Sequence, residues 1–436
     1  MDKFFHSVTL DADRCLGCTN CIKRCPTEAI RVRDGKASII SERCIDCGEC
    51  IRICPHHAKK PVYDHFSMLK EFKYNIALPA PSLYGQFNNL DDIDIVLSGL
   101  KRMGFDDVFE VSAAAELVSD ATRIYMAQKN IKKPVISSAC PAVVRLIRVR
   151  FPDLCDKVLP LKAPMEVAAD IARKRAREKH PELKDEEIGI FFISPCAAKV
   201  TDIKAPIGTE KSSVSGVLAI SSVFAELASQ MGKVETVEPL SESGIIGISW
   251  GGIGGESSAL LREQYLAADG IENVIRVLEE LEDEKFTDLD FIELNACAGG
   301  CLGGVLTVEN PYVARARLKR LRKYLPVSCS HVEKDEIPEE MKWTEELEFA
   351  PVMELSSDIG KAMEMMNRID EISAELPGLD CGSCGAPSCR CLAEDVVRGE
   401  AHLTDCVFIL RKRVQTAASA LSSIGINHIG KEDEEQ

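Results

Sequence analysis

The stretch ELNACAGGCLGG, residues 293–304, indicates most clearly how this chain folds and what it can bind. Cys297 and Cys301 are four residues apart, which predicts that both sulfurs lie on one face of a helical turn. The surrounding glycines would let the backbone approach a bulky group closely. A short apolar run, DFIEL (290–294), precedes them, so we expect a buried strand that ends just before the two cysteines.

Two further segments have the same setting. SSACP (137–141) contains Cys140 and follows PVIS, and SPCAAK (194–199) contains Cys196 and follows IGIFFIS. Each cysteine should therefore leave a buried strand and enter a turn or the start of a helix. Four thiolates from three loops suit a cubane iron–sulfur cluster. Lys199 adds a hydrogen-bond donor and a positive charge that a plain cubane would not need.

The N-terminal part contains the run C-x2-C-x2-C-x3-C-P twice within residues 15–54, the signature of a bacterial two-cluster ferredoxin. The fourth cysteine of each run reaches the other cluster. The predicted ligands are therefore Cys15, Cys18, Cys21 and Cys54 for one cubane, and Cys44, Cys47, Cys50 and Cys25 for the other. A pair of zinc sites is the alternative, but such sites usually lack the third close cysteine and the trailing proline. A ferredoxin module conducts electrons, so another domain must supply the bond chemistry.

From about residue 73 the chain alternates apolar and amphipathic segments, which predicts an α/β domain. The predicted buried strands of a parallel sheet are NIALPAPS (75–82), DVFEV (107–111), PVISS (134–138), IGIFFIS (188–194), IIGIS (245–249) and DFIEL (290–294). The predicted helices on its faces are residues 93–104, 114–129, 165–179 and 221–232. Sites in such sheets gather at the carboxyl ends of strands, where the cysteine segments lie.

Composition limits the classes of function. The 436 residues suffice for two to four domains, with 45% hydrophobic and 28% charged residues as in ordinary globular proteins. Nineteen cysteines at ligand spacings favour metal binding in a reducing compartment over a disulfide framework. We found no membrane span and no leader pattern, so we expect a cytoplasmic location. A net charge of −16 argues against nucleic-acid binding and suits electron-transfer partners.

Over about residues 73–325 the three cysteine segments, with GFDDVFEVSAAAEL (104–117) and LPLKAPM (159–165), resemble the active-site domain of [FeFe]-hydrogenases. The resemblance implies an H-cluster, in which Cys140, Cys196, Cys297 and Cys301 bind a [4Fe–4S] cluster. It implies that Cys301 also bridges to a di-iron unit with CO, CN and dithiolate ligands. The implied reaction is reversible conversion of H2 into two protons and two electrons. Lys199 matches the family lysine that donates a hydrogen bond to a cyanide ligand.

Four positions depart from the family pattern near the implied reacting centre. Ala139 replaces the cysteine that shuttles protons, and a methyl group cannot carry a proton. Asp202 stands for a glutamate, and Ser194 and Asn295 stand for two methionines, which predicts a more polar pocket. Asn295 would be able to donate a hydrogen bond to a CO or bridging ligand.

These departures predict an assembled site with slow turnover, resembling sensory hydrogenases that lack the shuttle cysteine. Two alternatives stay open. One is an iron–sulfur scaffold or electron-transfer protein without the di-iron unit. The other is a hydrogen sensor with no useful catalysis. Infrared spectroscopy would separate the scaffold from both hydrogenase readings, because bound CO and CN give characteristic bands.

The C-terminal part begins with a charged, non-periodic segment, residues 331–354, which we interpret as a linker. A helix is predicted through about residues 355–374. LPGLDCGSCGAPSCRCLAED (376–395) with Cys406 then resembles a small [4Fe–4S] module. The predicted ligands are Cys381, Cys384, Cys389 and Cys406, with Cys391 competing with Cys389, and structural zinc is the alternative. The final helix, 406–423, is expected to pack on this module rather than to dock a partner or a second copy of the chain.

The remaining features are expected to be structural. Cys155, Cys329 and Cys391 are expected to be buried, inert thiols. GISWGGIGGES (247–257) is glycine-rich, as a phosphate loop is, but it lacks a following lysine and a strand–helix context, so we do not expect nucleotide binding there.

The sequence thus predicts an α/β hydrogenase catalytic domain, an N-terminal α+β two-cluster ferredoxin domain and a small, mainly α C-terminal iron–sulfur module. The expected boundaries are 1–72 for the ferredoxin, 73–330 for the hydrogenase domain, 331–354 for the linker and 355–436 for the C-terminal module. The expected cofactors are four [4Fe–4S] clusters and the di-iron unit: two N-terminal clusters, one in the H-cluster and one C-terminal. The expected partners are H2, protons and a ferredoxin or signalling protein, with a homodimer left open.

Overall fold

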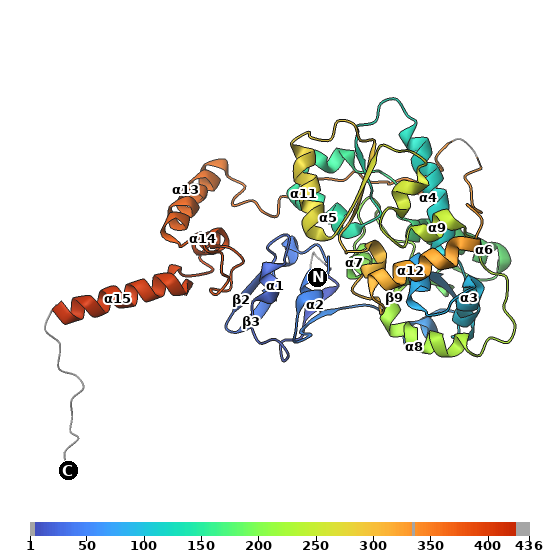
Figure 1. Cartoon of the computed structure of the whole chain (residues 1–436), viewed down its shortest axis with the longest axis horizontal. Coiled ribbons are helices and arrows are strands. Elements are labelled where there is room, and N and C mark those ends of the chain that lie inside the picture. The colour runs from blue at the N-terminus through green and yellow to red at the C-terminus, as the bar shows by residue number, and fades with distance from the viewer. Residues whose placement is uncertain (1–4, 334–335, 424–436) are drawn as a thin grey trace, which may run out of the picture. The chain divides into compact units, whose positions relative to one another are not determined.

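The computed structural model describes residues 5–333 and 336–423, and the chain divides into two compact units (Figure 1). The first unit comprises residues 1–9, 41–52 and 59–352, and the second comprises residues 10–40, 53–58 and 353–436. Each unit contains part of the predicted ferredoxin domain, and each is described by itself. Residues 1–4, 334–335 and 424–436, which belong to the predicted ferredoxin, linker and C-terminal module, lie outside the described residues.

A parallel sheet with the order β6-β5-β8-β9 lies at the centre of the first unit. Its strands are β5 (Tyr74–Pro79), β6 (Asp107–Val108), β8 (Ile188–Ser194) and β9 (Gly216–Ala219). β5 and β8 are buried along their whole length, as central strands of a parallel sheet are. Strand alternation directs Ile190 and Phe192 into one core and Phe191 and Ile193 into the other.

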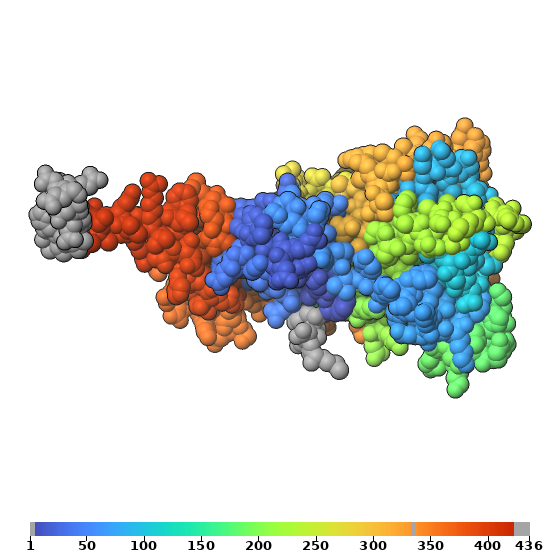
Figure 2. Space-filling view, turned by 90° about the horizontal axis from the view of Figure 1, so that it is seen from below, coloured from blue at the N-terminus to red at the C-terminus, as the bar shows by residue number. Residues whose placement is uncertain are grey.

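Helices cover both faces of this sheet. α4 (Val111–Met126) and α6 (Pro164–Lys179) pack in the core that contains Phe192. α3 (Ile93–Arg102), α8 (Ile220–Met231) and α12 (Pro311–Leu321) pack in the core that contains Phe191. Figure 2 shows α8 lying across the surface of the first unit. The four predicted helices, which correspond to α3, α4, α6 and α8, and the central strands are confirmed. The result is a three-layer α/β/α arrangement.

The first unit also contains a second parallel sheet, with the order β10-β11-β7, whereas the sequence predicted a single sheet. Its strands are β7 (Val135–Ile136), β10 (Tyr265–Asp269) and β11 (Phe291–Asn295). α5 (Pro141–Arg150) and α11 (Ile271–Glu282) cover one of its faces through Ile136, Ile292 and Leu294. Two of the predicted strands, 134–138 and 290–294, therefore belong to this sheet and not to the central one. Pairing between strands is a long-range property, so local alternation did not reveal the division.

The prediction of a strand at IIGIS was wrong, because residues Ile245–Ser249 form helix α9. Glu116 of α4 accepts hydrogen bonds from the backbone N–H groups of Gly244 and Gly247 at 2.7 and 3.3 Å. A Cβ on Gly247 would lie 2.1 Å from the Ser112 carbonyl oxygen, so the helix packs closely on α4 only through this glycine. Five residues of apolar sequence do not distinguish a short buried helix from a strand.

Most of the predicted linker is instead part of the first unit. Met341 is buried, and its carbonyl accepts a hydrogen bond from the Lys162 N–H at 2.8 Å. The Trp343 N–H donates to the Pro160 carbonyl at 3.1 Å. Residues 336–352 therefore pack on the α/β domain of the first unit, although their charge and lack of periodicity resemble a linker.

The second unit combines the β2–β3 hairpin with the C-terminal module. β2 (Ile30–Arg33) and β3 (Lys36–Ile39) are antiparallel. Asp395 accepts two hydrogen bonds from the Arg31 guanidinium, at 2.7 and 3.0 Å, and one from Arg33 at 2.7 Å. The Val32 N–H donates to the Gly385 carbonyl at 2.8 Å. Segments more than 350 residues apart in sequence therefore form one packed body.

The remaining elements are short or terminal. They are β1 (Val8–Leu10), which pairs with β4 (Lys59–Pro61), and the helices α1 (Asn20–Lys23), α2 (Glu49–Ile53), α7 (Ala197–Lys204), α10 (Gly255–Ala259), α13 (Ile359–Glu375), α14 (Cys389–Val397) and α15 (Val407–Ser423). Short 3-10 helices lie at Ser41–Arg43, Phe66–Glu71, Pro81–Gln86, Pro152–Lys157, Asp185–Glu187, Gly300–Gly303, Arg322–Tyr324, Glu339–Met341 and Leu403–Asp405. Across residues 5–333 and 336–423, no helix has the length and apolarity that crossing a membrane requires.

Candidate metal centre

The three cysteine segments leave strands where the sequence predicted. Cys140 follows β7 and is the N-cap of α5, whose first residue is Pro141. Cys196 follows β8 and is the N-cap of α7. Cys297 lies two residues after the end of β11. The carboxyl ends of β7, β8 and β11 therefore present the cysteines, as expected for an α/β site.

The third segment does not form the predicted helical turn. Gly299 and Gly300 have left-handed backbone conformations, with φ of +85° and +70°, and a 3-10 turn follows at Gly300–Gly303. A Cβ on Gly300 would lie 2.7 Å from the Ile253 nitrogen, so only glycine fits this close approach. The Gly300 N–H donates to the Cys297 carbonyl at 3.0 Å. The two glycines thus turn the chain between Cys297 and Cys301.

The four predicted H-cluster cysteines lie together, and each of them is half-buried. Burial raises the pKa of the Cys196 thiol to about 11, the ammonium of Lys199 lowers it, and the charges of Cys301 and Cys140 raise it further. Burial also raises the pKa of Cys297, followed by the charge of Cys196. Thiolates in this place therefore need a strong positive charge nearby, which bound iron would supply.

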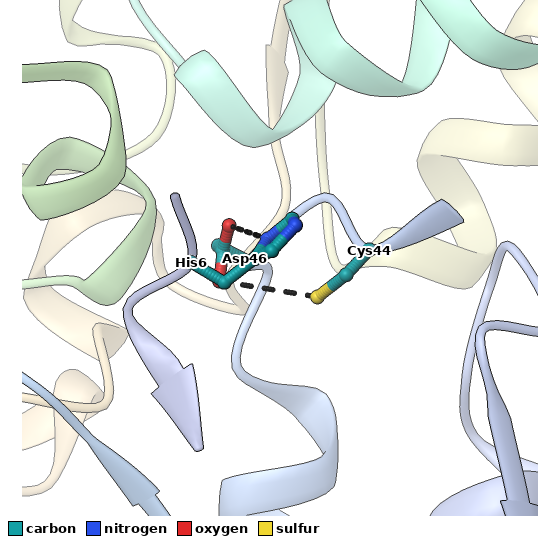
Figure 3. Close-up of side chains that lie close together, drawn as sticks. All are labelled: His6, Cys44 and Asp46. Atoms are coloured by element: carbon teal, nitrogen blue, oxygen red, sulfur yellow. Dashed lines mark hydrogen bonds and ion pairs between the residues drawn. The ribbon is translucent and has the colours of Figure 1, made fainter. Parts of the chain in front are cut away.

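Candidate ligands for a single metal ion lie close together at one place in the described residues. In the described residues, one group of three candidate ligands has all its ligand atoms within 4.8 Å of one another, namely His6, Cys44 and Asp46 (Figure 3). No three sulfurs of the H-cluster set or of the C-terminal set meet this limit in the described part of the chain.

A cavity lies beside Cys301. Its walls include Ala139, Lys199 and Asn295, together with apolar side chains such as Met165 and Phe192. The Lys199 ammonium lies 3.3 Å from the Ala139 carbonyl oxygen and 4.0 Å from the Cys301 sulfur. Burial by itself lowers the pKa of Lys199, but the charges of Cys301, Cys196 and Cys140 outweigh it and raise the pKa. The lysine therefore stays charged next to the position that a di-iron unit would take, and this donor set fits that group.

Ser194 and Asp202 do not line this cavity. The Ser194 hydroxyl donates to the Cys196 carbonyl at 3.0 Å and accepts from the Cys196 N–H at 3.2 Å, so it holds the turn and does not line the cavity. Asp202 lines a neighbouring pocket with Glu166 and lies 3.9 Å from Arg145. Burial raises the pKa of Asp202 to about 6, against the lowering effect of Arg145 and Lys199. Of the two expected polar replacements for methionine, only Asn295 reaches the cavity.

Sequence reasoning missed two buried carboxyl groups that line the cavity, Glu256 and Glu293. Glu256 accepts a hydrogen bond from the Ser137 hydroxyl at 2.6 Å, and the Ala139 N–H donates to that same hydroxyl at 3.1 Å. Glu293 accepts from Asn295 at 3.1 Å. Burial raises the pKa of Glu256 to about 8, with a further contribution from Glu293. A glutamate inside the buried strand DFIEL was the available signal.

Residues 41–52 of the ferredoxin pattern lie next to this centre within the first unit. Ile45 is buried in the core that contains Ala198 and Ala296, and Cys47 packs against the same core. Arg52 donates to the Gly303 carbonyl at 3.0 Å. Its charge also lowers the pKa of Cys297, against the dominant effect of burial. The sequence gave no sign of this arginine, because it lies 245 positions before Cys297 and the two meet only after folding.

Figure 3 shows how His6 and Asp46 lie beside Cys44. His6 Nδ1 lies 2.9 Å from Asp46 Oδ2, and the Val8 N–H donates to Asp46 at 3.0 Å. Cys44 donates to the same carboxylate at 3.8 Å. The His6–Asp46 pair thus supports the loop that carries the predicted cluster ligand.

The other ferredoxin cysteines divide between the units. Cys15, Cys18, Cys21 and Cys54 all belong to the second unit, whereas Cys25 belongs to the second and Cys44, Cys47 and Cys50 belong to the first. The Ala37 N–H donates to the Cys15 sulfur at 3.4 Å and the Ala58 N–H to the Cys54 sulfur at 3.3 Å, contacts typical of cluster thiolates. Both ligand sets stay predictions.

The C-terminal module brings three predicted ligands close enough to influence one another. Burial raises the pKa of Cys384, and the charges of Cys406 and Cys381 raise it further. Cys391 is buried, and its thiol donates to Glu28 at 2.8 Å. Burial and then the charge of Glu28 raise its pKa to about 12. Cys391 is therefore engaged elsewhere, which leaves Cys389 as the better fourth ligand.

The prediction that Cys155 and Cys329 are buried was wrong. Cys155 is half-buried at the end of a 3-10 turn, and Cys329 is exposed. Neither lies in a segment with other cysteines. Sequence hydrophobicity does not report exposure at such isolated positions.

Comparison with known families supports the architecture. The profile described as "Iron only hydrogenase large subunit, C-terminal domain" matches residues 73–267 and 261–305. A 4Fe-4S dicluster domain matches residues 7–55, and a putative Fe-S cluster module matches residues 376–408.

Similar proteins are distant. Iron hydrogenase 1 of Clostridium pasteurianum is 23% identical over 287 residues, 53% of this chain and 50% of that protein. The NADP-reducing hydrogenase subunit HndD of Solidesulfovibrio fructosivorans is 28% identical over 118 residues, 25% of this chain and 20% of that protein. The chain thus spans at most half the length of these relatives. A structure of [FeFe]-hydrogenase HydA1 from Chlamydomonas reinhardtii aligns with 60% of this chain and 89% of its own, at 14% identity and a TM-score of 0.47.

The family profile covers more than half of the chain and includes all four predicted H-cluster cysteines and Lys199. The chain is an iron–sulfur protein with the N-terminal dicluster domain, the α/β hydrogenase domain and the C-terminal iron–sulfur module that the sequence predicted. It belongs to the iron-only hydrogenase large subunit family.

Proposed function

We propose that this protein binds an H-cluster and converts H2 reversibly into two protons and two electrons, with slow turnover suited to hydrogen sensing. The observation that carries the proposal is the cavity at Cys301, which has a buried lysine and no thiol at position 139. The charged lysine favours an anionic metal group there, and the missing thiol removes the usual proton donor.

Each protein residue has a distinct role in this proposal. Cys140, Cys196, Cys297 and Cys301 would hold the cubane, with Cys301 bridging to the di-iron unit. When bound, that unit would supply the open metal position at which H2 is split or formed. Lys199 would donate from its ammonium to an anionic ligand, and its contact with the Ala139 carbonyl fixes its direction.

Protons need a carrier because Ala139 has none. Glu256 lines the same cavity, and its pKa of about 8 lets it hold or release a proton near neutral pH. Its hydrogen bond from Ser137 holds the carboxyl group beside residue 139. The neighbouring charge of Glu293 disfavours a second negative charge, so the two carboxyl groups would share a proton. A longer route through a carboxyl pair is consistent with slow turnover.

Electrons would leave or enter through the ferredoxin clusters. Residues 41–52 lie beside the cysteines of the hydrogenase domain, with Arg52 next to Cys297. In the second unit, the loop of the C-terminal module contacts the first ferredoxin segment, because the Lys23 ammonium donates to the Pro387 carbonyl at 3.3 Å. The Arg33 guanidinium donates to the Cys384 carbonyl at 2.7 Å. We infer that a ferredoxin or a signalling protein exchanges electrons with these outer clusters.

The decisive experiment is infrared spectroscopy of protein that has been matured with the di-iron unit. We expect stretching bands from bound CO and CN that shift when H2 is added. A fully reconstituted protein without such bands would contradict the proposal and favour the iron–sulfur scaffold.

A variant tests the proton argument. Ala139→Cys should raise H2 turnover by about 10²-fold or more, the usual contribution of a positioned acid or base. Ala139→Ser is the matched control, because it adds a group of similar size that does not exchange protons as readily. Equal activity of both fully metallated variants and the parent protein would contradict the reasoning.

The domain boundaries at residues 72, 330 and 354 stay predictions.

A further inference from the structure

A second and larger cavity lies on the other side of the glycine-rich loop. Its volume is about 1150 Å³. Its walls come from the loop, from β10 and from the end of α12 with the 3-10 turn that follows. We call it the cationic cavity, and it is lined by Ile245, Ser249, Gly252, Ile253, Gly254, Gly255, Ser258, Tyr265, Ala267, Leu302, Arg315, Leu318, Lys319, Arg322 and Lys323.

Four cations share one wall of this cavity. Arg315, Lys319, Arg322 and Lys323 are spaced four, seven and eight residues along the helix, so they lie on one face. None of the described lining residues is acidic. Arg322 donates to the Ser249 hydroxyl at 2.6 Å, and within the described part of the chain none of the four forms an ion pair. In a chain with a net charge of −16, such a cluster attracts an anion.

We propose that the cationic cavity binds a phosphate-bearing ligand of nucleotide size. The four cations extend over about 12 Å of helix, at about 1.5 Å per residue, which suits two or more phosphate groups. The opposite side offers Tyr265 and Ile253 as apolar surface for a base. A site of this volume is slightly larger than most small-molecule pockets, which have about 300–1,000 Å³, and it exceeds what inorganic phosphate needs. The sequence lacked a lysine after the glycine-rich loop, but folding brings to it Lys319 from α12 and Lys323 from the 3-10 turn that follows.

The same loop forms a wall of the active-site cavity. Trp250, Gly251 and Glu256 line that cavity, whereas Gly252 and Gly254 line the cationic one. This loop also holds Glu293 in place. The N–H groups of Gly254 and Ser257 donate to its carboxylate at 2.9 and 2.8 Å.

A ligand that orders the loop would therefore act on the two carboxyl groups that we assign to proton transfer. This coupling rests on the proposed function, whereas the binding site itself does not.

Titration calorimetry on the full reconstituted chain tests the binding site. The probes are ATP, GTP, NADPH, inorganic tripolyphosphate and, as an acidic polypeptide for comparison, polyglutamate, each up to millimolar concentration. We expect a nucleotide to bind, and the double variant Arg315→Glu with Lys319→Glu to weaken it by about tenfold or more. Arg320→Glu is the matched control, because Arg320 lies on the same helix but outside the cavity.

Three results would overturn the binding site: no probe binds, the control weakens binding as much as the double variant, or only an acidic polypeptide such as polyglutamate binds. Hydrogen exchange tests the coupling, since the bound nucleotide should slow exchange at the Gly254 and Ser257 amides. Unchanged exchange at these amides would overturn the coupling. Neither measurement needs the di-iron unit, so each is distinguishable from a failure of the hydrogenase proposal.

Discussion

Replacing Glu166 by glutamine should remove a specific part of the pH dependence of stability. Glu166 is buried on α6, where it accepts hydrogen bonds from the Ser212 hydroxyl at 2.5 Å and the Ser213 N–H at 2.9 Å. Burial raises its pKa from 4.5 to about 7, and the two hydrogen bonds lower it only in part. The folded protein therefore holds this proton more tightly than the unfolded chain does.

The sign and magnitude follow from proton linkage. A raised pKa means that the contribution is fully present below pH 4.5 and is lost as the pH rises through 7. Between pH 5 and pH 8, the parent protein should lose about 2.5 kcal/mol of unfolding free energy from this group. Glu166→Gln cannot titrate, so the variant should lack this loss. The glutamine amide would replace one of the two accepting oxygens with an N–H donor, and this mispairing would lower the unfolding free energy by about 1–2 kcal/mol at every pH.

The assay is guanidinium unfolding followed by tryptophan fluorescence. The only two tryptophans of the chain, Trp250 and Trp343, both belong to the first unit, so the signal reports the unit that contains Glu166. Glu178→Gln is the matched control, because Glu178 is exposed on the same helix. An identical difference in unfolding free energy between pH 5 and pH 8 for the parent protein and Glu166→Gln would refute the reasoning.

Three further predictions concern the two metal-binding regions. Asp395→Ala should destabilise the second unit by about 3–5 kcal/mol, because it leaves the buried Arg31 guanidinium without its carboxylate, and hydrogen exchange in β2 would report the loss. Cys391→Ser should retain the iron of the C-terminal module while Cys389→Ser loses it, as measured by iron content and electron paramagnetic resonance; the opposite pattern would exchange their roles. Glu256→Gln should lower H2 turnover by about 10²-fold or more with the CO and CN bands intact, and unchanged turnover would exclude this carboxyl group as the proton carrier.

The strands and main helices of the catalytic domain were predictable because their patterns are local. The buried strands at 75–79 and 188–194 are continuous apolar runs, and the helices that flank them have one apolar face. The errors arose where tertiary contacts decide the conformation. IIGIS is a helix because Gly244 and Gly247 bind Glu116 on α4, and residues 336–352 pack on the domain despite a composition typical of linkers.

The sequence by itself indicated the strand ends that carry the cysteines and the family, and it predicted the cysteine ligands, since thiolate spacing and strand periodicity are set by neighbouring residues. Only the tertiary structure brought Glu256, Glu293 and Arg52 to those cysteines and placed Lys319 and Lys323 at the glycine-rich loop. Ser194 and Asp202 do not line the cavity beside Cys301. The physical reason is that burial depends on segments that are far apart in sequence and meet only when the chain folds. Burial raises the pKa of a carboxyl group and strengthens the interaction between neighbouring charges.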